Sequence, residues 1–259
     1  MGIIADGKIV DFTFLILIWA VAALYIWVIG GDKFNIRRMV AIDAIEEAIG
    51  RAVEMGKAVI MNIGGGGLLQ GEYAPASMAG LTVLGYCAGI TAKLDAELLC
   101  PMYSSGGVET IPVATELLRD AYMAEGALDR FNAEEMIPFL PVQASVMALA
   151  DRVKPAANIM VGYYWHESCI WAEAFGRVGA IQVGGTTNLY QIPFFAGACD
   201  YVLIGEEIYP VSAYISKDPR LVATIAAQDT FKWISLLLLI IGALMVTAGN
   251  TWLSNLMMK

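Results

Sequence analysis

Hydrophobic and polar residues are distributed so that one uncharged apolar stretch lies near each end of the chain. The first stretch covers residues 12–31 and is closed by Asp11 and Asp32. A membrane-spanning helix needs about 20 such residues, whereas the apolar core of a secretory signal has only about 7–15. The second stretch begins at Trp233, an aromatic residue of the kind found at membrane interfaces. We therefore predict two transmembrane helices, at 12–31 and 233–254.

Between these stretches, short apolar runs alternate with longer amphipathic segments. Most of the short runs end in Gly, Ser or Pro, which is typical of strands buried on both faces of a parallel sheet. The longer segments carry apolar residues at helical spacing, as Ile42, Ile45 and Ile49 do. The predicted strands are 58–63, 97–103, 136–140, 158–164, 180–183 and 201–204. The predicted helices are 37–55, 77–94, 109–125, 142–153, 167–177 and 189–198.

This alternation predicts the fold class. Strands that alternate with helices form βαβ units with right-handed crossovers. The expected fold is α/β, a doubly wound, mostly parallel, Rossmann-like sheet that is flanked by two transmembrane helices. The predicted domain order is a tail at 1–11, the first span at 12–31, an α/β domain at 32–232, the second span at 233–254 and a tail at 255–259.

The basic residues beside the spans predict the orientation in the cell membrane. Lys33, Arg37 and Arg38 follow the first span, and three more basic residues precede the second. Between each span and the nearer terminus, the only basic residues are Lys8 and Lys259. The positive-inside rule then places the α/β domain in the cytoplasm and both termini outside.

Composition supports a membrane protein and narrows the possible partners. Of the 259 residues, 58% are hydrophobic and 16% are charged, and the net charge is −9. A soluble domain has about 25% charged residues, and a nucleic-acid-binding protein is expected to have a basic face. The lipid bilayer is therefore an expected partner and nucleic acid is not. The four cysteines are scattered without metal-ligand spacing, so no metal site is expected and a reducing compartment is indicated.

Candidate ligand-binding residues follow the predicted strands, because open parallel sheets bind ligands beyond the carboxyl ends of their strands. Pairs of glycines there allow backbone N–H groups to approach an anion closely. The first glycine run fits neither dinucleotide nor P-loop spacing, so both a simple turn and phosphate or nucleotide binding remain open. The candidates are Gly64, Gly65, Gly66, Gly67, Ser104, Ser105, Gly184, Gly185, Thr186 and Thr187.

Candidate catalytic residues are fewer. His166 is the only histidine, and it stands with Glu167 where a strand gives way to a helix. A histidine that acts as a general base is often oriented by a carboxylate, and the same two residue types also occur together at ordinary helix N-termini. Glu206 and Glu207 form a pair of carboxylates after the last predicted strand. The pair is equally consistent with acid–base chemistry and with stabilisation of a helix N-terminus.

Small residues suggest close packing of helices. Gly85 and Gly89 share one face of a predicted helix, and small residues also occur in the second span. Glycine inside a helix costs about 1 kcal/mol relative to alanine, and close packing offsets this cost. Either the sheet or another subunit can supply that packing, and we expect a homo-oligomer.

Four segments resemble a known family. These are 154–158, 179–186, 193–201 and 204–207, which include the sequences KPAAN and AIQVGGT. They are similar to segments of a prokaryotic membrane-protein family described as a domain of unknown function. The resemblance covers most of residues 35–232. It implies a membrane-tethered α/β domain and brings no catalytic residue, substrate or cofactor.

Three functions remain open from the sequence. The first is a non-enzymatic assembly or scaffold subunit that binds copies of itself or a membrane-protein partner. The second is a regulatory domain that binds a small ligand or nucleotide at the glycine-rich strand ends. The third is a membrane-proximal enzyme that uses His166 and Glu167.

Overall fold

The computed structural model describes residues 8–69, 71–103, 108–140 and 144–252 of the chain. The chain divides into two compact units. One unit is Arg38–Ile215, and the other combines Met1–Arg37 with Ser216–Lys259. The α/β unit is therefore inserted between the two halves of a helical unit.

The larger unit is built on a five-stranded sheet. Its strand order is β2-β1-β5-β6-β7, and every pair of neighbours is parallel. The predicted α/β class with a parallel sheet is confirmed. The strands are β1 (Val59–Gly64), β2 (Leu98–Leu99), β5 (Ala157–Tyr163), β6 (Ile181–Thr186) and β7 (Tyr201–Ile204).

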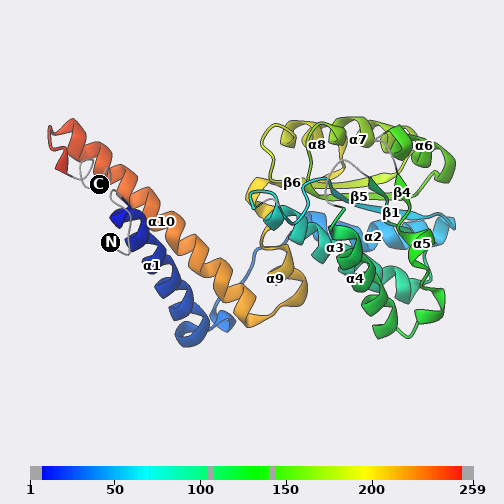
Figure 1. The fold of residues 1–259 in the computed structure, drawn as a ribbon, viewed down its shortest axis with the longest axis horizontal. Coiled ribbons are helices and arrows are strands. Elements are labelled where there is room, and N and C mark those ends of the chain that lie inside the picture. Colours follow the sequence, from blue (N-terminus) through cyan, green and yellow to red (C-terminus); the bar gives the residue numbers. More distant parts are fainter. Residues whose placement is uncertain (1–7, 70, 104–107, 141–143, 253–259) are drawn as a thin grey trace. The chain divides into compact units, whose positions relative to one another are not determined.

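Helices cover both faces of this sheet (Figure 1). On one face lie α2 (Val40–Met55) and α3 (Ala74–Leu94), with α4 (Thr110–Ala124) packed against α3. On the other face lie α6 (Ala144–Val153), α7 (Glu167–Arg177) and α8 (Ile192–Ala198). This second face holds a buried core in which residues of these helices meet β1 and β5, among them Val146, Phe175, Phe195, Ile60 and Met160.

Two predicted strands differ from those observed. Residues 97–103 divide into β2 and β3 (Met102–Tyr103), because Pro101 between them has no N–H for the ladder. The run 136–140 begins as the last residue of α5 (Ala133–Met136) and only then forms β4 (Phe139–Leu140). Strands β3 and β4 pair with each other in a separate parallel sheet.

The order of strands reverses at one place in the sheet. From β1 the chain crosses to β2 on one side, and it later returns to β5 on the other side of β1. Ligands of open α/β sheets bind at such a switch point, in the crevice outside the carboxyl ends of the strands. A ligand site is therefore expected at the carboxyl ends of β1 and β5.

The smaller unit is a pair of long helices. It contains α1 (Ile9–Leu24), continued by a π-helical turn at Tyr25–Ile29, a 3-10 turn at Gly31–Lys33, and α10 (Pro219–Thr247). The Tyr25 hydroxyl and Thr230 Oγ1 lie 2.6 Å apart in a hydrogen bond between the two helices. The large side chains of α1 and of the second half of α10 are mostly exposed, as expected of helices that face lipid.

Three helices are long and apolar enough to cross a membrane, whereas the sequence predicted two. Two of them, Val10–Ile29 and α10, overlap the predicted spans. Helix α10 begins well before the predicted start at Trp233, so the polar stretch ahead of that residue belongs to the same helix. The third is α3, more than half of whose apolar window is buried against the sheet and α4.

Candidate functional site

The glycine run Gly64–Gly67 lies at the switch point, with Gly64 as the last residue of β1 and the other three glycines directly after it. The backbone comes so close to β5 here that a Cβ on Gly64 would overlap the carbonyl oxygen of Tyr163. Gly64 also has a φ of +75°, which side chains rarely allow. A Cβ on Gly66 would lie 2.6 Å from the Cβ of Tyr163. The glycines are therefore needed for close packing between the ends of the two strands.

Several N–H groups of this loop are bound by the chain itself. Asn62 Oδ1 accepts from the N–H of Gly64 at 2.8 Å, and the carbonyl oxygen of Tyr163 accepts from the N–H of Gly65 at 3.0 Å. These donors are the groups that would hold a phosphate in a glycine-rich loop. Their internal partners favour the turn over the phosphate-binding loop.

Glu109 binds two further N–H groups of this loop, and the sequence did not indicate it as a site residue. Its Oε1 accepts hydrogen bonds from the N–H of Leu68 at 2.9 Å and of Leu69 at 3.2 Å. Hydrogen bonds from its own backbone N–H and from Leu68 hold the pKa of the Glu109 carboxyl below its usual value, since they favour the charged form. The carboxylate therefore uses two N–H groups that a bound anion would otherwise need.

Three aromatic rings pack together beside the loop. The ring centroids of Tyr73 and Tyr163 are 4.1 Å apart, and Trp165 meets both rings edge-on. A hydrogen bond to Glu72 raises the pKa of Tyr73 to about 12. The rings contact one another directly, and Trp165 is exposed.

One polar atom behind the loop has no partner among the described residues. The Oγ of Ser77, in the first turn of α3, is buried and makes no hydrogen bond. A Cβ on Gly66 would lie 3.1 Å from this oxygen. An orphaned buried hydroxyl is costly, so Ser77 marks the one position here where a further polar group would be stabilising.

His166 and Glu167 occupy very different environments. His166 is exposed at the N-cap of α7, whereas Glu167 is completely buried. The Oε2 of Glu167 accepts from the N–H of Trp165 at 3.2 Å, a residue that precedes α7, and the side chain of the N-cap residue His166 makes no capping hydrogen bond. The helix-start interpretation therefore rests only on the favourable position of a carboxylate in the first turn of a helix.

Gly184, Gly185 and Thr186 belong to β6 itself, so the prediction that they follow the strand is wrong. A Cβ on Gly184 would overlap the ring of Phe195, and one on Gly185 would lie 3.0 Å from Leu203 Cβ. The side chains of neighbouring elements occupy the space that the glycines leave. Thr187 lies just beyond the strand and is half-buried. Ser104 and Ser105 lie outside the described residues.

Glu206 is exposed in the 3-10 turn η4 (Gly205–Ile208) after β7. Its neighbour Glu207 accepts from the N–H of Ile204 at 2.9 Å. Within the described part of the chain, no group of three or more His, Cys, Asp or Glu side chains could hold a metal ion.

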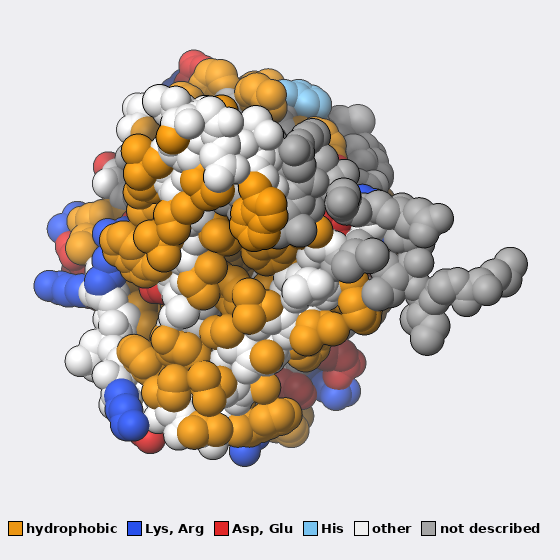
Figure 2. Space-filling model, turned by 90° about the vertical axis from the view of Figure 1, so that its left-hand side faces the viewer, with side chains coloured by type: hydrophobic (Ala, Val, Ile, Leu, Met, Phe, Trp, Pro, Cys, Tyr) orange, Lys and Arg blue, Asp and Glu red, His pale blue; other side chains and the backbone are white. Residues whose placement is uncertain are grey.

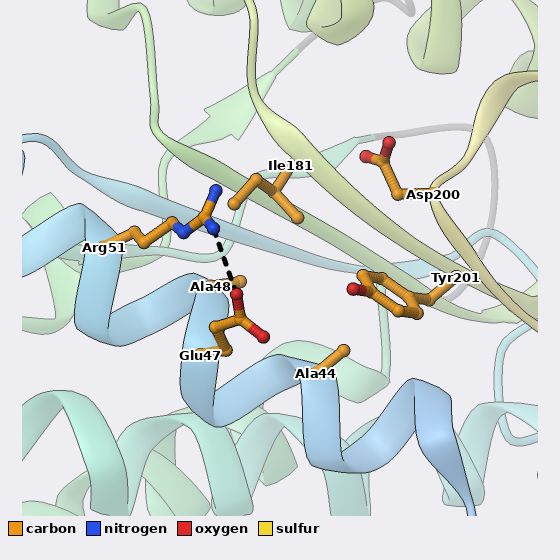
Figure 3. Close-up of a pocket in the computed structure, with 7 residues that line it drawn as sticks. All are labelled: Ala44, Glu47, Ala48, Arg51, Ile181, Asp200 and Tyr201. Carbon is orange, nitrogen blue, oxygen red and sulfur yellow. Dashed lines mark ion pairs between the residues drawn. The ribbon is translucent and has the colours of Figure 1, made fainter.

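The opposite edge of the sheet carries a small polar pocket of about 140 Å³ between α2 and the starts of β6 and β7 (Figure 3). Arg51 and Glu47 form an ion pair of 3.1 Å at its wall, facing Asp200 and Tyr201. Asp200 accepts from the backbone N–H of Gln182. Arg51 balances only one of the two carboxylates, so the pocket has a net negative charge.

Comparison with known proteins gives one match, a family model described as Domain of unknown function (DUF6754), over residues 3–257. The chain belongs to this family. The matched residues include both apolar ends and the α/β unit. No curated protein and no solved structure matches the chain.

Proposed function

We propose that the protein is a membrane-anchored, non-enzymatic assembly or scaffold subunit. The observation that carries this proposal is the closed switch point. The chain's own Glu109, Asn62 and Tyr163 take up N–H groups of the glycine-rich loop, and aromatic rings pack against one another beside it. A catalytic cleft would instead present unsatisfied groups to a substrate.

The proposed anchoring uses α1 and α10 as the two spans. Basic residues on the domain side of both spans support a cytoplasmic α/β unit with both termini outside. Anchoring at both ends restricts the rotation of the unit, which suits a part that must meet partners in a fixed orientation. Because homo-oligomers are the commonest assemblies, a second copy of the chain is the first partner to test.

The test is the mass of the intact protein when it is extracted together with its lipids. We expect a discrete oligomer whose mass does not change in the variant His166→Ala, since that exposed side chain has no catalytic task in a scaffold. A monomer at micromolar concentration would contradict the proposal. Loss of a cellular phenotype in His166→Ala, with the oligomer intact, would favour the enzyme instead.

A second candidate function is a small-ligand or nucleotide-binding regulatory domain. The orphaned Oγ of Ser77 behind Gly66 favours it, because a bound polar group would satisfy this hydroxyl. A nucleotide that raises the Tm of the wild type, but not of Ser77→Ala, would support this function. Equal Tm values with and without nucleotides in both proteins would reject it.

A further inference from the structure

The loops at the carboxyl edge of the sheet expose large apolar side chains to solvent. Each of β1, β5, β6 and β7 ends in or is followed by at least one such residue. Leu69 is 83% exposed, Leu189 77% and Tyr190 84%. We call this set the apolar tips: Leu69, Trp165, Leu189, Tyr190 and Ile204. The abundant hydrophobic side chains in Figure 2 are a different set, because that view faces the end of Figure 1 where α1 and α10 lie.

The loops at the opposite edge have a different character. They comprise residues 56–58, 95–97, 154–156, 178–180 and 199–200, which lead into β1, β2, β5, β6 and β7. Within these loops no residue is an exposed large hydrophobic, although Met55 and Leu94 at the adjoining helix ends are exposed. Five of the loop residues are charged: Lys57, Asp95, Glu97, Lys154 and Asp200. A purely random scatter of surface apolar residues would not favour one edge.

Both connections to the apolar helices leave the α/β unit toward the edge with the apolar tips. Helix α2 ends just before β1 begins, so its C-terminus lies at the amino edge and its N-terminus, next to Arg38, points away from it. Helix α9 (Val211–Ser216) follows the carboxyl end of β7. The hydroxyl of Tyr214 donates to Asp43 at 2.6 Å, which holds the entry and exit of the chain together.

We propose that the apolar tips dock on the surface of a lipid bilayer. Leucine and isoleucine supply buried apolar area there, and Trp165 and Tyr190 are of the residue types that favour the membrane interface. No Lys or Arg occurs in these loops, whereas Glu72 and Glu206 do. The surface therefore suits zwitterionic lipid, and anionic headgroups add nothing to its binding.

This inference rests on the membrane anchoring proposed above, so its test must separate the two. A photoreactive phenylalanine analogue replaces Tyr190 in the full chain, which is reconstituted in phosphatidylcholine vesicles. The same analogue replaces Met55 at the amino edge, where the side chain is also exposed (56%). It replaces Trp27, in the first apolar helix, as the measure of anchoring. After irradiation, adducts with lipid and with protein are separated by mass.

We expect lipid adducts at positions 190 and 27, with about tenfold less at position 55, because only buried apolar surface reaches the acyl region. The yield at 190 should be the same when anionic lipid or high salt is added. Lipid adducts at 27 alone would overturn the docking and leave the anchoring intact. Protein–protein adducts at 190 in place of lipid adducts would identify the tips as an interface between copies, which also overturns it. Without adducts at 27, anchoring and docking both fail.

Discussion

At the scale of single residues, glycines in this chain act in two opposite ways. Gly64 has a positive φ and a backbone oxygen where its Cβ would lie, so no other residue fits without displacement. Gly89 lies in α3 with nothing within 4 Å of its missing Cβ. The first glycine is required by packing, whereas the second only adds conformational freedom to the unfolded chain.

Substitution by alanine should therefore have opposite effects at these two positions. We expect Gly64→Ala to lower the free energy of unfolding by about 2–4 kcal/mol, through backbone strain and overpacking. We expect Gly89→Ala to raise it by about 0.5–1 kcal/mol. Urea unfolding in detergent measures both. Destabilisation by Gly89→Ala would show that a second subunit packs against this face of α3.

The carboxylate of Glu109 should make the loop after β1 sensitive to pH. Glu109→Gln is expected to lower the free energy of unfolding by about 1 kcal/mol, since one charge-assisted acceptor is lost at a partly exposed site. Because the pKa of Glu109 is lowered in the folded state, its contribution is fully present above the usual glutamate value of 4.5. It disappears as the pH falls through the lower, folded value. Unfolding curves of the two proteins should converge in acid, and a constant difference would refute this role.

The loops after β1 and β5 could be predicted from the sequence, but the residues that bind their N–H groups could not. The glycine run and the Trp165–Glu167 segment were found because they follow apolar runs. Glu109 could not be predicted as a site residue because it binds residues about forty positions earlier in the chain, and no local pattern encodes such a contact. Ser77 was missed for the same reason, since only the folded chain brings its hydroxyl behind Gly66.

At the scale of elements, the α3 helix combines the hydropathy of a membrane span with the packing of a core helix. It lies on β1 and β5, and a Cβ on Gly80 would overlap the carbonyl oxygen of Val161. Hydropathy alone does not separate the two roles, since helices that are buried all round are apolar all round. The elements were predictable where the period was clear, as in α7. The end of β6 could not be predicted, because a pair of glycines is typical of a turn. In the folded chain, Gly184 and Gly185 instead give room to Phe195 and Leu203.

The burial of α3 can be tested through its cysteine. Burial raises the pKa of the Cys87 thiol well above its usual value, and it raises that of Cys100 to about 12. At pH 8, a maleimide should therefore label half-buried Cys169 long before either of these, because the thiolate is the reactive form. All four cysteines should react after denaturation in urea. Rapid labelling of Cys87 in the native protein would exclude the packing of α3 described here.

At the scale of the whole molecule, an α/β unit interrupts a helical unit. The chain passes from one unit to the other at Arg38 and at Ile215, and the two units differ in composition. The apolar fraction of the sequence is thereby explained by two sources, exposed helices in one unit and strands buried on both faces in the other.

The proposed orientation predicts where proteases can act. Protease added to sealed cells should leave residues 32–232 intact, because the basic flanks place this region in the cytoplasm. After permeabilisation, cleavage is expected at exposed sites such as Lys217 and Arg220. Digestion of the central region in sealed cells would reverse the proposed topology.

The hydrogen bond between Tyr25 and Thr230 joins residues 205 positions apart. At a synthesis rate of about 5–20 residues per second, the ribosome takes on the order of 10–40 s to make the segment between them. In the proposed anchoring, the first helix lacks this intramolecular partner during that time and enters the bilayer through its own hydropathy. The absence of charge from 12–31 would then be a requirement of biosynthesis as much as of the finished structure. The second helix, by contrast, arrives when its partner and a complete α/β unit already exist.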